Sequence, residues 1–358
     1  MSVVNFLLAL VGLYLLWTIT IRLGMKRLNC WRTFSRESFF EGESGELTEV
    51  VRNDTWFIIP WLRVESCISP YIRLGSQDNL QVSGEMYYCS FFTMMPHQQI
   101  RRRHKVTFLK RGAYDLGNAS LTSGDILGAF NLSRSQNLTT PVLVYPRLLD
   151  PEELPMPISR QMGELARRQQ LQTDPFLVRG IRTYQPGDPV RDIHWPATAR
   201  MGEPQVRLHD YSARTRLLVV LNVQYQELQL NNYIPDTESD PIEEGIRLAA
   251  SICIHSLRAG MAAGIAANMP MAEDNEPTVI LPAEGSAQEA ELLNASARLR
   301  IHCAQLFPSF LESLAGSSGL NILVLSRYDS ESLRAAGRML ENNGNQVTFH
   351  LLEGGKRS

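Results

Sequence analysis

TRLLVVLNV, the stretch from Thr215 to Val223, is an apolar run rich in valine and leucine. A short run of this kind between polar segments is typical of a strand buried on both faces of a sheet. Further apolar runs follow it in MAAGIAAN, PTVIL, NILVLSRY (321–328) and QVTFHLLE. Helical spacing separates several of them. The alternation predicts an α/β domain over residues 215–358, a doubly wound sheet with helices on both faces.

Two of the intervening helices carry recognisable end signals. Apolar residues recur at helical spacing in EEGIRLAASICIHSLRAG (243–260), and Gly260 is a suitable terminating residue. In SESLRAAGRMLENNG, Ser330 is placed to cap the N-terminus and Gly344 to stop the helix. In an open α/β sheet the binding crevice lies at the carboxyl ends of the strands. The residues after LLVVL, from Asn222 to Gln226, are therefore the first place to look for a site.

The N-terminus reads as a membrane anchor, assigned to residues 1–24. VVNFLLALVGLYLLWTITI, from Val3 to Ile21, has no charged residue and about the length that spans ~30 Å of hydrocarbon as a helix. A cleavable signal peptide would carry basic residues before this run and an A-x-A site after it. Here the basic residues follow the run, as Arg22, Lys26, Arg27 and Arg32. The positive-inside rule therefore predicts a single-pass protein of the cell membrane whose bulk lies in the cytoplasm.

Between the anchor and the α/β domain, the chain changes character twice. After a juxtamembrane segment (25–44), residues 45–149 hold short apolar stretches broken by turn signals, which predicts an antiparallel β-sandwich. The basic run at Arg101–Lys105 is expected at a strand edge, with attraction to anionic lipid as the alternative. Residues 150–214 are polar and proline-bearing, and we expect a connector with one helix. The chain is thus multidomain, α/β plus all-β.

Composition excludes several classes of function. The 358 residues carry a formal net charge of −2, which gives no general attraction to nucleic acid. The five cysteines form no C-x-x-C pair, so a zinc site is not indicated, and their odd number suits a reducing compartment. The chain contains no G-x-x-x-x-G-K-[ST], H-E-x-x-H or G-x-S-x-G pattern. We therefore expect no enzyme activity and no cofactor.

The densest cluster of charge lies in FLVRGIRTYQPGDPVRDIHWPATAR, residues 176–200. Its pattern, R-x-Y-x-P-G-D-x-x-R-x-I-x-W-x-x-x-A-R, resembles the signature of the bacterial family called domain of unknown function 58. The positions that match are Arg182, Tyr184, Pro186, Gly187, Asp188, Arg191, Ile193, Trp195, Ala199 and Arg200. The upstream stretch RRHKVTFLKRGAYDLGNASLTSGDILGAF, followed by VLVYPR, also resembles the sandwich region of that family. The likeness covers nearly the whole chain.

The resemblance implies a membrane-anchored protein with a β-sandwich and a von Willebrand factor A-like domain. Members are often encoded beside MoxR-type AAA+ ATPases, which implies such an ATPase as a partner in assembling or maturing other complexes. Members commonly have two closely spaced N-terminal membrane helices. This chain shows one clear span, so its topology depends on the flanking charges.

The von Willebrand A fold usually binds a divalent metal through D-x-S-x-S after its first strand. The matching positions here are Asn222, Gln224 and Gln226, which are all neutral amides. Hard cations prefer sites that include carboxylates. The sequence therefore predicts a degenerate site without a metal. The alternative function, a metal-dependent adhesion or receptor module facing outward, is disfavoured by this loss and by the flanking charges.

Two interpretations of the signature segment remain open. In the first it clamps the connector and sandwich onto the first α/β strand, since arginine–carboxylate pairs suit such a contact. In the second it is a docking surface for a partner, because exposed Arg and Trp are favoured anchors. Both assign the same residues, Arg182, Tyr184, Gly187, Asp188, Arg191, Trp195 and Arg200. A catalytic role for Asp192 and His194 is least favoured, because no serine or cysteine nucleophile is nearby.

Overall fold

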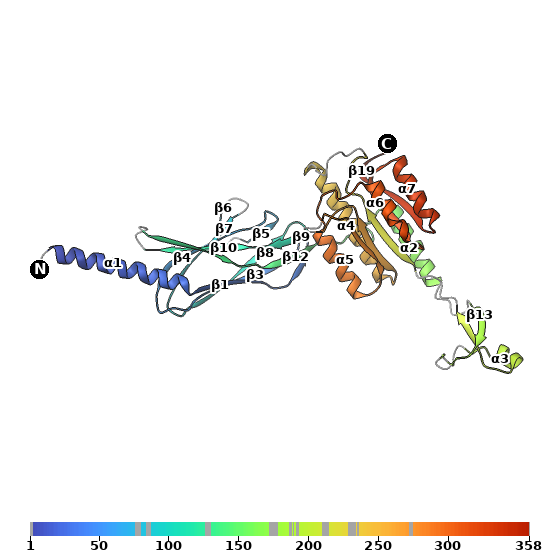
Figure 1. The fold of residues 1–358 in the computed structure, drawn as a ribbon, viewed down its shortest axis with the longest axis horizontal. Coiled ribbons are helices and arrows are strands. Elements are labelled where there is room, and N and C mark those ends of the chain that lie inside the picture. Colours follow the sequence, from blue (N-terminus) through green and yellow to red (C-terminus); the bar gives the residue numbers. More distant parts are fainter. Residues whose placement is uncertain are drawn as a thin grey trace. The chain divides into compact units, whose positions relative to one another are not determined.

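The computed structural model describes residues 3–75, 80–83, 87–125, 130–171, 178–185, 188, 190, 193–209, 215–227, 234, 236–271 and 275–357. The chain divides into two compact units, Met1–Arg147 and Leu148–Ser358 (Figure 1).

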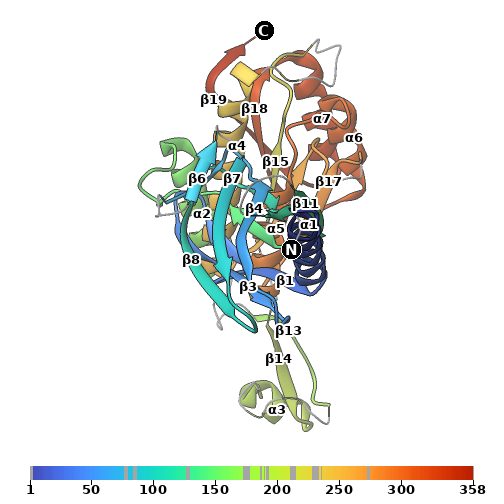
Figure 2. The same ribbon diagram turned by 90° about the vertical axis from the view of Figure 1, so that its left-hand side faces the viewer.

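The first unit begins with helix α1, Val3–Lys26. It is long and apolar enough to cross a membrane, and most of its apolar side chains are exposed. Its last two turns differ, because Ile21 and Met25 are each only 1% exposed and belong to the core of the strands that follow. Figure 2 views α1 almost end-on, with strands of the same unit, including β4, beside it. The predicted apolar helix is therefore extended by a segment that packs against the sheets.

Three sheets make up the rest of this unit. Their orders are β1-β3-β8-β5, β11-β10-β4-β7-β6 and β2-β12-β9, and the pairing is antiparallel except between β2 and β12. The strands are β1 (Leu28–Phe34), β2 (Ser38–Phe40), β3 (Ser44–Asn53), β4 (Ile59–Cys67), β5 (Ile72–Leu74), β6 (Leu80–Ser83), β7 (Tyr87–Met94), β8 (Gln99–Phe108), β9 (Gly112–Asp115), β10 (Asn118–Gly124), β11 (Asn131–Asn137) and β12 (Pro141–Tyr145).

Side chains from facing sheets meet in shared apolar clusters. One cluster joins β1 and β3 to β4, β7 and β10, together with the end of α1. A second cluster joins β3, β5 and β8 to β2, β12 and β7 around the stacked rings of Phe39 and Phe108. The clusters are continuous because successive residues of a strand point to opposite faces, so alternate apolar residues line the interior.

Residues 25–44, expected to form a juxtamembrane segment, instead contain β1 and β2. Strand β1 pairs with β3 along its whole length, from Leu28 opposite Asn53 to Phe34 opposite Leu47. The strand was hidden because one of its inward positions is an arginine, Arg32, which breaks the apolar alternation. This placement also corrects the expected role of Arg32. It is buried and is not a charge flanking the membrane span.

The second unit is built on a sheet of order β17-β16-β15-β18-β19, parallel except for β17. Its helices and strands are α2 (Met156–Leu171), β13 (Val178–Thr183), α3 (Trp195–Met201), β14 (Gln205–His209), β15 (Arg216–Leu221), α4 (Asp236–Arg258), β16 (Ala262–Ala267), β17 (Thr278–Ala283), α5 (Ser286–Arg298), α6 (Phe307–Ser313), the 3-10 turn η2 (Leu314–Gly316), β18 (Asn321–Asp329), α7 (Glu331–Asn342) and β19 (Gln346–Arg357).

Helices cover both faces of this sheet. Leu218 and Val220 of β15 pack in one cluster with residues of α6 and α7. On the opposite face, α4 lies so close to the sheet that a Cβ at Gly245 would be 3.0 Å from Leu221 Cδ1. The expected α/β alternation is therefore observed. Its end signals also hold, because the Ser330 side chain accepts from Leu333 N to cap α7, and Gly260 follows α4 with φ of 80°.

Residues 150–214, expected as a connector, contain helix α2 and an antiparallel pair of strands, β13 and β14. The strand pair was not expected because its residues are largely polar or charged, as in VRGIRT and QVRLH. Strands this short, with so few apolar residues, give only a weak periodic signal. The signature segment therefore forms a small structure of its own within the second unit.

Candidate functional site

Strands β13 and β14 frame the signature segment. They pair from Val178 opposite His209 to Thr183 opposite Gln205, with a bulge near Gly180. An isolated bridge between Ile193 and Val206 and a hydrogen bond from His194 N to Gln205 O (2.7 Å) attach the intervening loop to β14. The loop is therefore held at several points along one strand.

Helix α3 is short, and both of its ends are capped. The His194 ring accepts at Nδ1 from Ala197 N (3.0 Å), which satisfies a free donor at the helix start. Pro196 lies in the first turn, where its missing N–H costs nothing. Gly202, with φ of 73°, ends the helix. His194 therefore has a structural role as a helix cap, and Asp192 lies outside the described residues.

An ion pair organises the turn before α3. Arg182 donates two hydrogen bonds to Asp188, each of 2.7 Å, in the bidentate geometry that guanidinium and carboxylate favour. Gln185 N also donates to Asp188 Oδ2 (2.8 Å). The hydrogen bonds from Arg182, and to a lesser extent the one from Gln185, hold the pKa of Asp188 below its ordinary value. Asp188 is therefore paired with Arg182, whereas Arg191 and Gly187 lie outside the described residues.

This frame presents apolar side chains to solvent. Trp195 is 65% exposed and Met201 is 71% exposed, at opposite ends of α3. Val190 and Ile181 are exposed nearby in the chain, Arg200 is exposed and Tyr184 is half-buried. Over the described part of residues 178–209, the hydrogen bonds of the segment end within the segment itself. The clamp onto the first α/β strand stays a prediction.

At the carboxyl end of β15, the predicted degenerate metal site is a buried amide network. Asn222 is 1% exposed; its Nδ2 donates to Ser326 Oγ (3.0 Å) and its Oδ1 accepts from Gln224 N (2.9 Å). Gln224 is fully buried, and its Oε1 accepts from Phe307 N (2.7 Å) at the start of α6. Gln226, in contrast, is exposed. The oxygens of Asn222 and Gln224 already accept backbone donors and carry no charge, so these residues do not fit a divalent cation.

Neighbouring strand ends extend this network. Asn268, after β16, accepts at Oδ1 from Val223 N (2.8 Å) and donates to Gln305 O (3.0 Å). In β18, Ser326 Oγ donates to Tyr328 O (2.7 Å), and burial raises the pKa of Tyr328 to about 12. Sequence reasoning missed Asn268 and Ser326, although both follow from applying the strand-end rule to the adjacent parallel strands.

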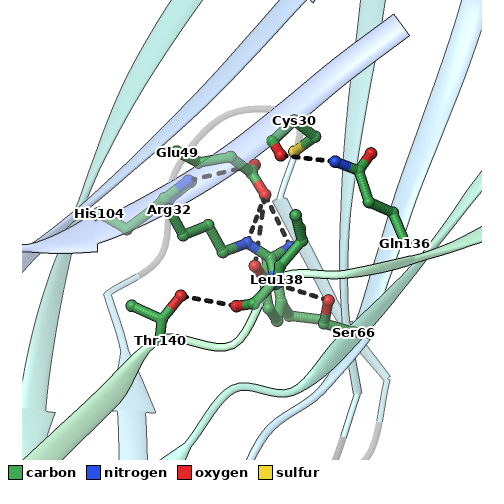
Figure 3. A network of polar contacts seen from close by, with 9 residues as sticks. Cys30, Arg32, Glu49, Ser66, His104, Gln136, Leu138 and Thr140 are labelled. Carbon is green, nitrogen blue, oxygen red and sulfur yellow. Dashed lines mark hydrogen bonds and ion pairs between the residues drawn. The ribbon is translucent and has the colours of Figure 1, made fainter.

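A second polar network lies inside the first unit (Figure 3). Arg32 of β1 donates to Glu49 Oε1 of β3 through Nε (3.0 Å) and Nη2 (2.8 Å), and to Ser66 Oγ of β4 through Nη1 (2.7 Å). Both charged side chains are 0% exposed. The Arg32 guanidinium also lies 5.0 Å from the centre of the Tyr88 ring in β7. No local pattern of residues indicates this network, because its members are far apart in the chain.

His104 of β8 completes the surroundings of Glu49. Its Nε2 lies 3.8 Å from Glu49 Oε2, too long for a hydrogen bond but close enough for an ion pair. Burial would raise the pKa of Glu49, but His104 and Arg32 outweigh that effect and hold the pKa below its ordinary value. Burial, reinforced by the Glu49 charge, raises the pKa of the nearby Cys30 thiol to about 12. A protonated, buried thiol of this kind is unreactive.

The basic run at Arg101–Lys105 is divided by the alternation of β8. Arg101, Arg103 and Lys105 are exposed on one face, while His104 is buried on the other. Arg102 lies 4.0 Å from the centre of the Phe92 ring and donates to Phe91 O (2.6 Å). The run is therefore not a uniform solvated edge, because two of its members point toward the neighbouring sheet.

Comparison with known proteins adds a family match. Residues 180–297 match the model of a family described as Protein of unknown function DUF58. The matched region begins within β13 at Gly180 and ends within α5 at Ala297. It therefore includes the signature positions from Arg182 to Arg200 and the amides at the strand ends. A search of curated protein sequences finds no match.

Among solved structures, the chain is similar to a CARDB domain from Pyrococcus furiosus in complex with di-metal ions (17% identity, 33% of this chain, 91% of that chain, TM-score 0.22). It is also similar to the third cohesin ScaC from Acetivibrio cellulolyticus, in complex with a dockerin (8%, 32%, 99%, TM-score 0.23). BslA, a bacterial hydrophobin, gives 9% identity over 34% of this chain and 96% of that chain, with a TM-score of 0.21. Scores this low support no inference about function.

Proposed function

We propose that the chain is a membrane-anchored, non-enzymatic interaction protein. In this proposal the first unit is a β-sandwich spacer, and the second is a von Willebrand A-like domain whose metal site is degenerate. The docking surface is the exposed part of residues 178–209, and the partner is a MoxR-type AAA+ ATPase that acts in assembly or maturation of other complexes. The choice of partner rests on the resemblance of the signature segment, and the family match at residues 180–297 supports that resemblance.

The exposure of Trp195 carries the proposal. A tryptophan that is 65% exposed, on the same short helix as a methionine that is 71% exposed, has a cost in water unless another surface covers it. Aromatic residues and methionine are enriched in the cores of protein interfaces. The caps of α3 and the Arg182–Asp188 pair fix the local backbone before binding, which lowers the entropy lost on association.

The buried amides at the strand ends favour recognition without a metal. In this proposal Asn222 and Gln224 replace the ion as internal cross-links, because they tie β15 to β18 and to the start of α6. The proposed binding energy then comes from the protein surface and not from a shared cation.

We place the bulk of the chain in the cytoplasm. Lys26 is the last residue of α1, Arg27 directly follows it, and Arg22 lies in its last turns. Arg32 is buried and does not count as a flanking charge, but the excess of basic residues at this end of α1 remains without it.

The test is binding of the detergent-solubilised full-length chain to the purified MoxR-type ATPase of the same organism. Replacing two central anchors, as in Trp195→Ala/Met201→Ala, should weaken binding by about 2 kcal/mol or more, roughly 30-fold in Kd. The matched control is Met156→Ala/Met339→Ala, which removes two exposed methionines elsewhere in the same unit. The control should bind as the wild type does.

Equal affinity of the Trp195→Ala/Met201→Ala variant and the wild type would remove the docking surface from the proposal. Absence of any binding between the wild type and the ATPase would remove the partner. Circular dichroism of each variant checks that the second unit stays folded.

A further inference from the structure

Two loops of the first unit meet at the end where α1 joins the sheets. One connects β3 to β4 and contains Trp56 and Ile58; the other connects β7 to β8 and contains Met95 and His97. Trp56 is 81% exposed, Met95 is 54% exposed and Ile58 is 48% exposed. The Trp56 and His97 rings contact each other edge to face, with their centres 4.6 Å apart. We call these two loops, residues 54–58 and 95–98, the apolar rim.

The rim is rigidly built, so the exposure of its side chains is not the result of a loose loop. Asn53, which is fully buried, donates from Nδ2 to Phe57 O (2.8 Å) in one loop and to Met95 O (2.9 Å) in the other. Its Oδ1 accepts from Thr55 N and from Thr55 Oγ1. His97 N donates to Thr55 O (3.1 Å), which joins the loops a second time. One buried amide therefore fixes both loops.

The rim is also attached to the end of α1. A Cβ at Gly24 would lie 3.5 Å from Ile59 Cγ1 and 3.9 Å from Thr55 Oγ1, so the last turn of the helix packs against this loop. Asp54 N donates to Arg27 O (3.4 Å), directly after the helix. Figure 1 shows the last turns of α1 lying alongside the same end of the sheets. The rim is thus continuous with the point at which the chain leaves α1.

Charge around the rim favours a lipid surface. Lys26 and Arg27 follow the apolar run of α1, and Arg22 lies 5.2 Å from the centre of the Phe130 ring. The acidic residue of the loop, Asp54, is neutralised by Arg52 (2.6 Å) and accepts from Asn29 Nδ2 (2.9 Å). Aromatic residues with basic neighbours are typical of the membrane–water interface, where an apolar body and a polar tip are both satisfied.

We infer that the apolar rim inserts into the headgroup region of the membrane that α1 spans, with Trp56 as its main interfacial anchor. The inference rests on the membrane anchoring proposed above. A single helix leaves the attached unit free to tilt, whereas a helix together with a rigid rim gives a second line of contact. The rim therefore sets the orientation of the first unit against the bilayer.

The test uses the full-length chain in phosphatidylcholine vesicles that contain lipid brominated high on the acyl chains. Bromine quenches tryptophan emission only at short range, so it reports side chains at that depth. The Trp17→Phe variant removes the tryptophan of α1 from the signal. In this background we expect quenching to persist, and to fall when Trp56→Phe is added. Adding Trp195→Phe instead, a tryptophan of the second unit, should leave the quenched emission unchanged.

The outcomes separate the inference from the anchoring that it needs. Equal quenching in Trp17→Phe and in Trp17→Phe/Trp56→Phe, with stronger quenching in the wild type, would show that α1 inserts and the rim does not. That result overturns the inference alone. No quenching of the wild type would overturn the anchoring and the inference together. All three substitutions replace exposed side chains with a smaller aromatic, and thermal melting of each variant verifies the fold.

Discussion

Glu49 carries a full negative charge in the interior of the first unit, where burial by itself is strongly unfavourable. Its carboxylate is stabilised by Arg32, His104 and Tyr88, which reach it from three different strands. A buried pair of this kind adds little net stability compared with apolar residues, but it is costly to break on one side. It therefore selects one arrangement of β1, β3, β7 and β8 over alternatives that leave a charge unpaired.

We expect Glu49→Gln to destabilise the first unit by about 3–5 kcal/mol, because the substitution keeps the shape but leaves the Arg32 charge buried without a counter-ion. Urea denaturation measures the loss. The matched control is the double variant Arg32→Met/Glu49→Leu, which removes both charges and should lose less stability than Glu49→Gln. A double variant that is less stable than the single one would show that the pair contributes more than the avoidance of an isolated charge.

The same carboxylate predicts the acid response of the unit. The pKa of Glu49 is lower in the folded chain than in the unfolded chain, so the unfolded state takes up the proton first as the pH falls. The stability that Glu49 contributes is therefore complete above the ordinary carboxyl range and is lost as the pH falls through the folded pKa. Urea midpoints measured down the acid range should converge for the wild type and Glu49→Gln.

At the scale of the element, β16 and β17 approach too closely for any side chain at Gly264. A Cβ there would lie 2.4 Å from Ile280 O and 2.6 Å from Pro282 N, which are backbone atoms. The antiparallel pairing of the two strands also shifts register between Ala263 and Ile265. Glycine thus permits the one antiparallel strand to join the edge of an otherwise parallel sheet.

Gly264→Ala should destabilise the second unit by about 1–3 kcal/mol, because the backbone of β17 must move to admit the methyl group. Chemical denaturation of the purified chain provides the measurement. Gly163→Ala in α2 is the control, since no atom lies within 4 Å of its Cβ and alanine is the better helix former. If Gly264→Ala and Gly163→Ala changed the free energy of unfolding equally, the close approach of β17 to Gly264 would have no energetic cost of its own.

For the whole molecule, the described core clusters each fall within a single unit. The clusters of α1 and the twelve strands lie before Arg147, and the cluster around α6 and α7 lies after Leu148. Cooperative unfolding follows shared cores, so we expect two transitions in calorimetry of the detergent-solubilised chain. Glu49→Gln should lower the Tm of one transition and Gly264→Ala that of the other. A single transition lowered by both variants would show that the units unfold as one.

The helices and strands that could be predicted are those whose sequence signals lie within a few neighbouring residues. The charge-free run before Arg22 predicted α1, and the apolar runs after Thr215 predicted β15, β16, β17, β18 and β19. Ser330 and Gly260 marked helix ends because capping depends on neighbours a few residues away. The Arg182–Asp188 pair was within reach for the same reason, since six residues separate its members.

What local pattern missed has a common physical cause. Strand β1 carries a buried arginine, β13 has no regular alternation, and β14 alternates over only five residues with two apolar positions, so none gives a strong strand signal. The β13–β14 pair is stabilised by backbone hydrogen bonds, which every sequence can form. Their presence is decided by what the strands pair with.

The amino-acid sequence by itself determined the apolar N-terminal helix, the α/β alternation of the C-terminal half and the loss of carboxylates after β15, because each is a matter of residue type at adjacent positions. Tertiary structure alone decided that Arg32 meets Glu49 and His104, that Gln224 bonds to the start of α6, and that Thr55 and Ile59 lie beside the end of α1. These contacts join residues far apart in the chain. Their energies depend on distance and burial, which no local pattern of residues encodes.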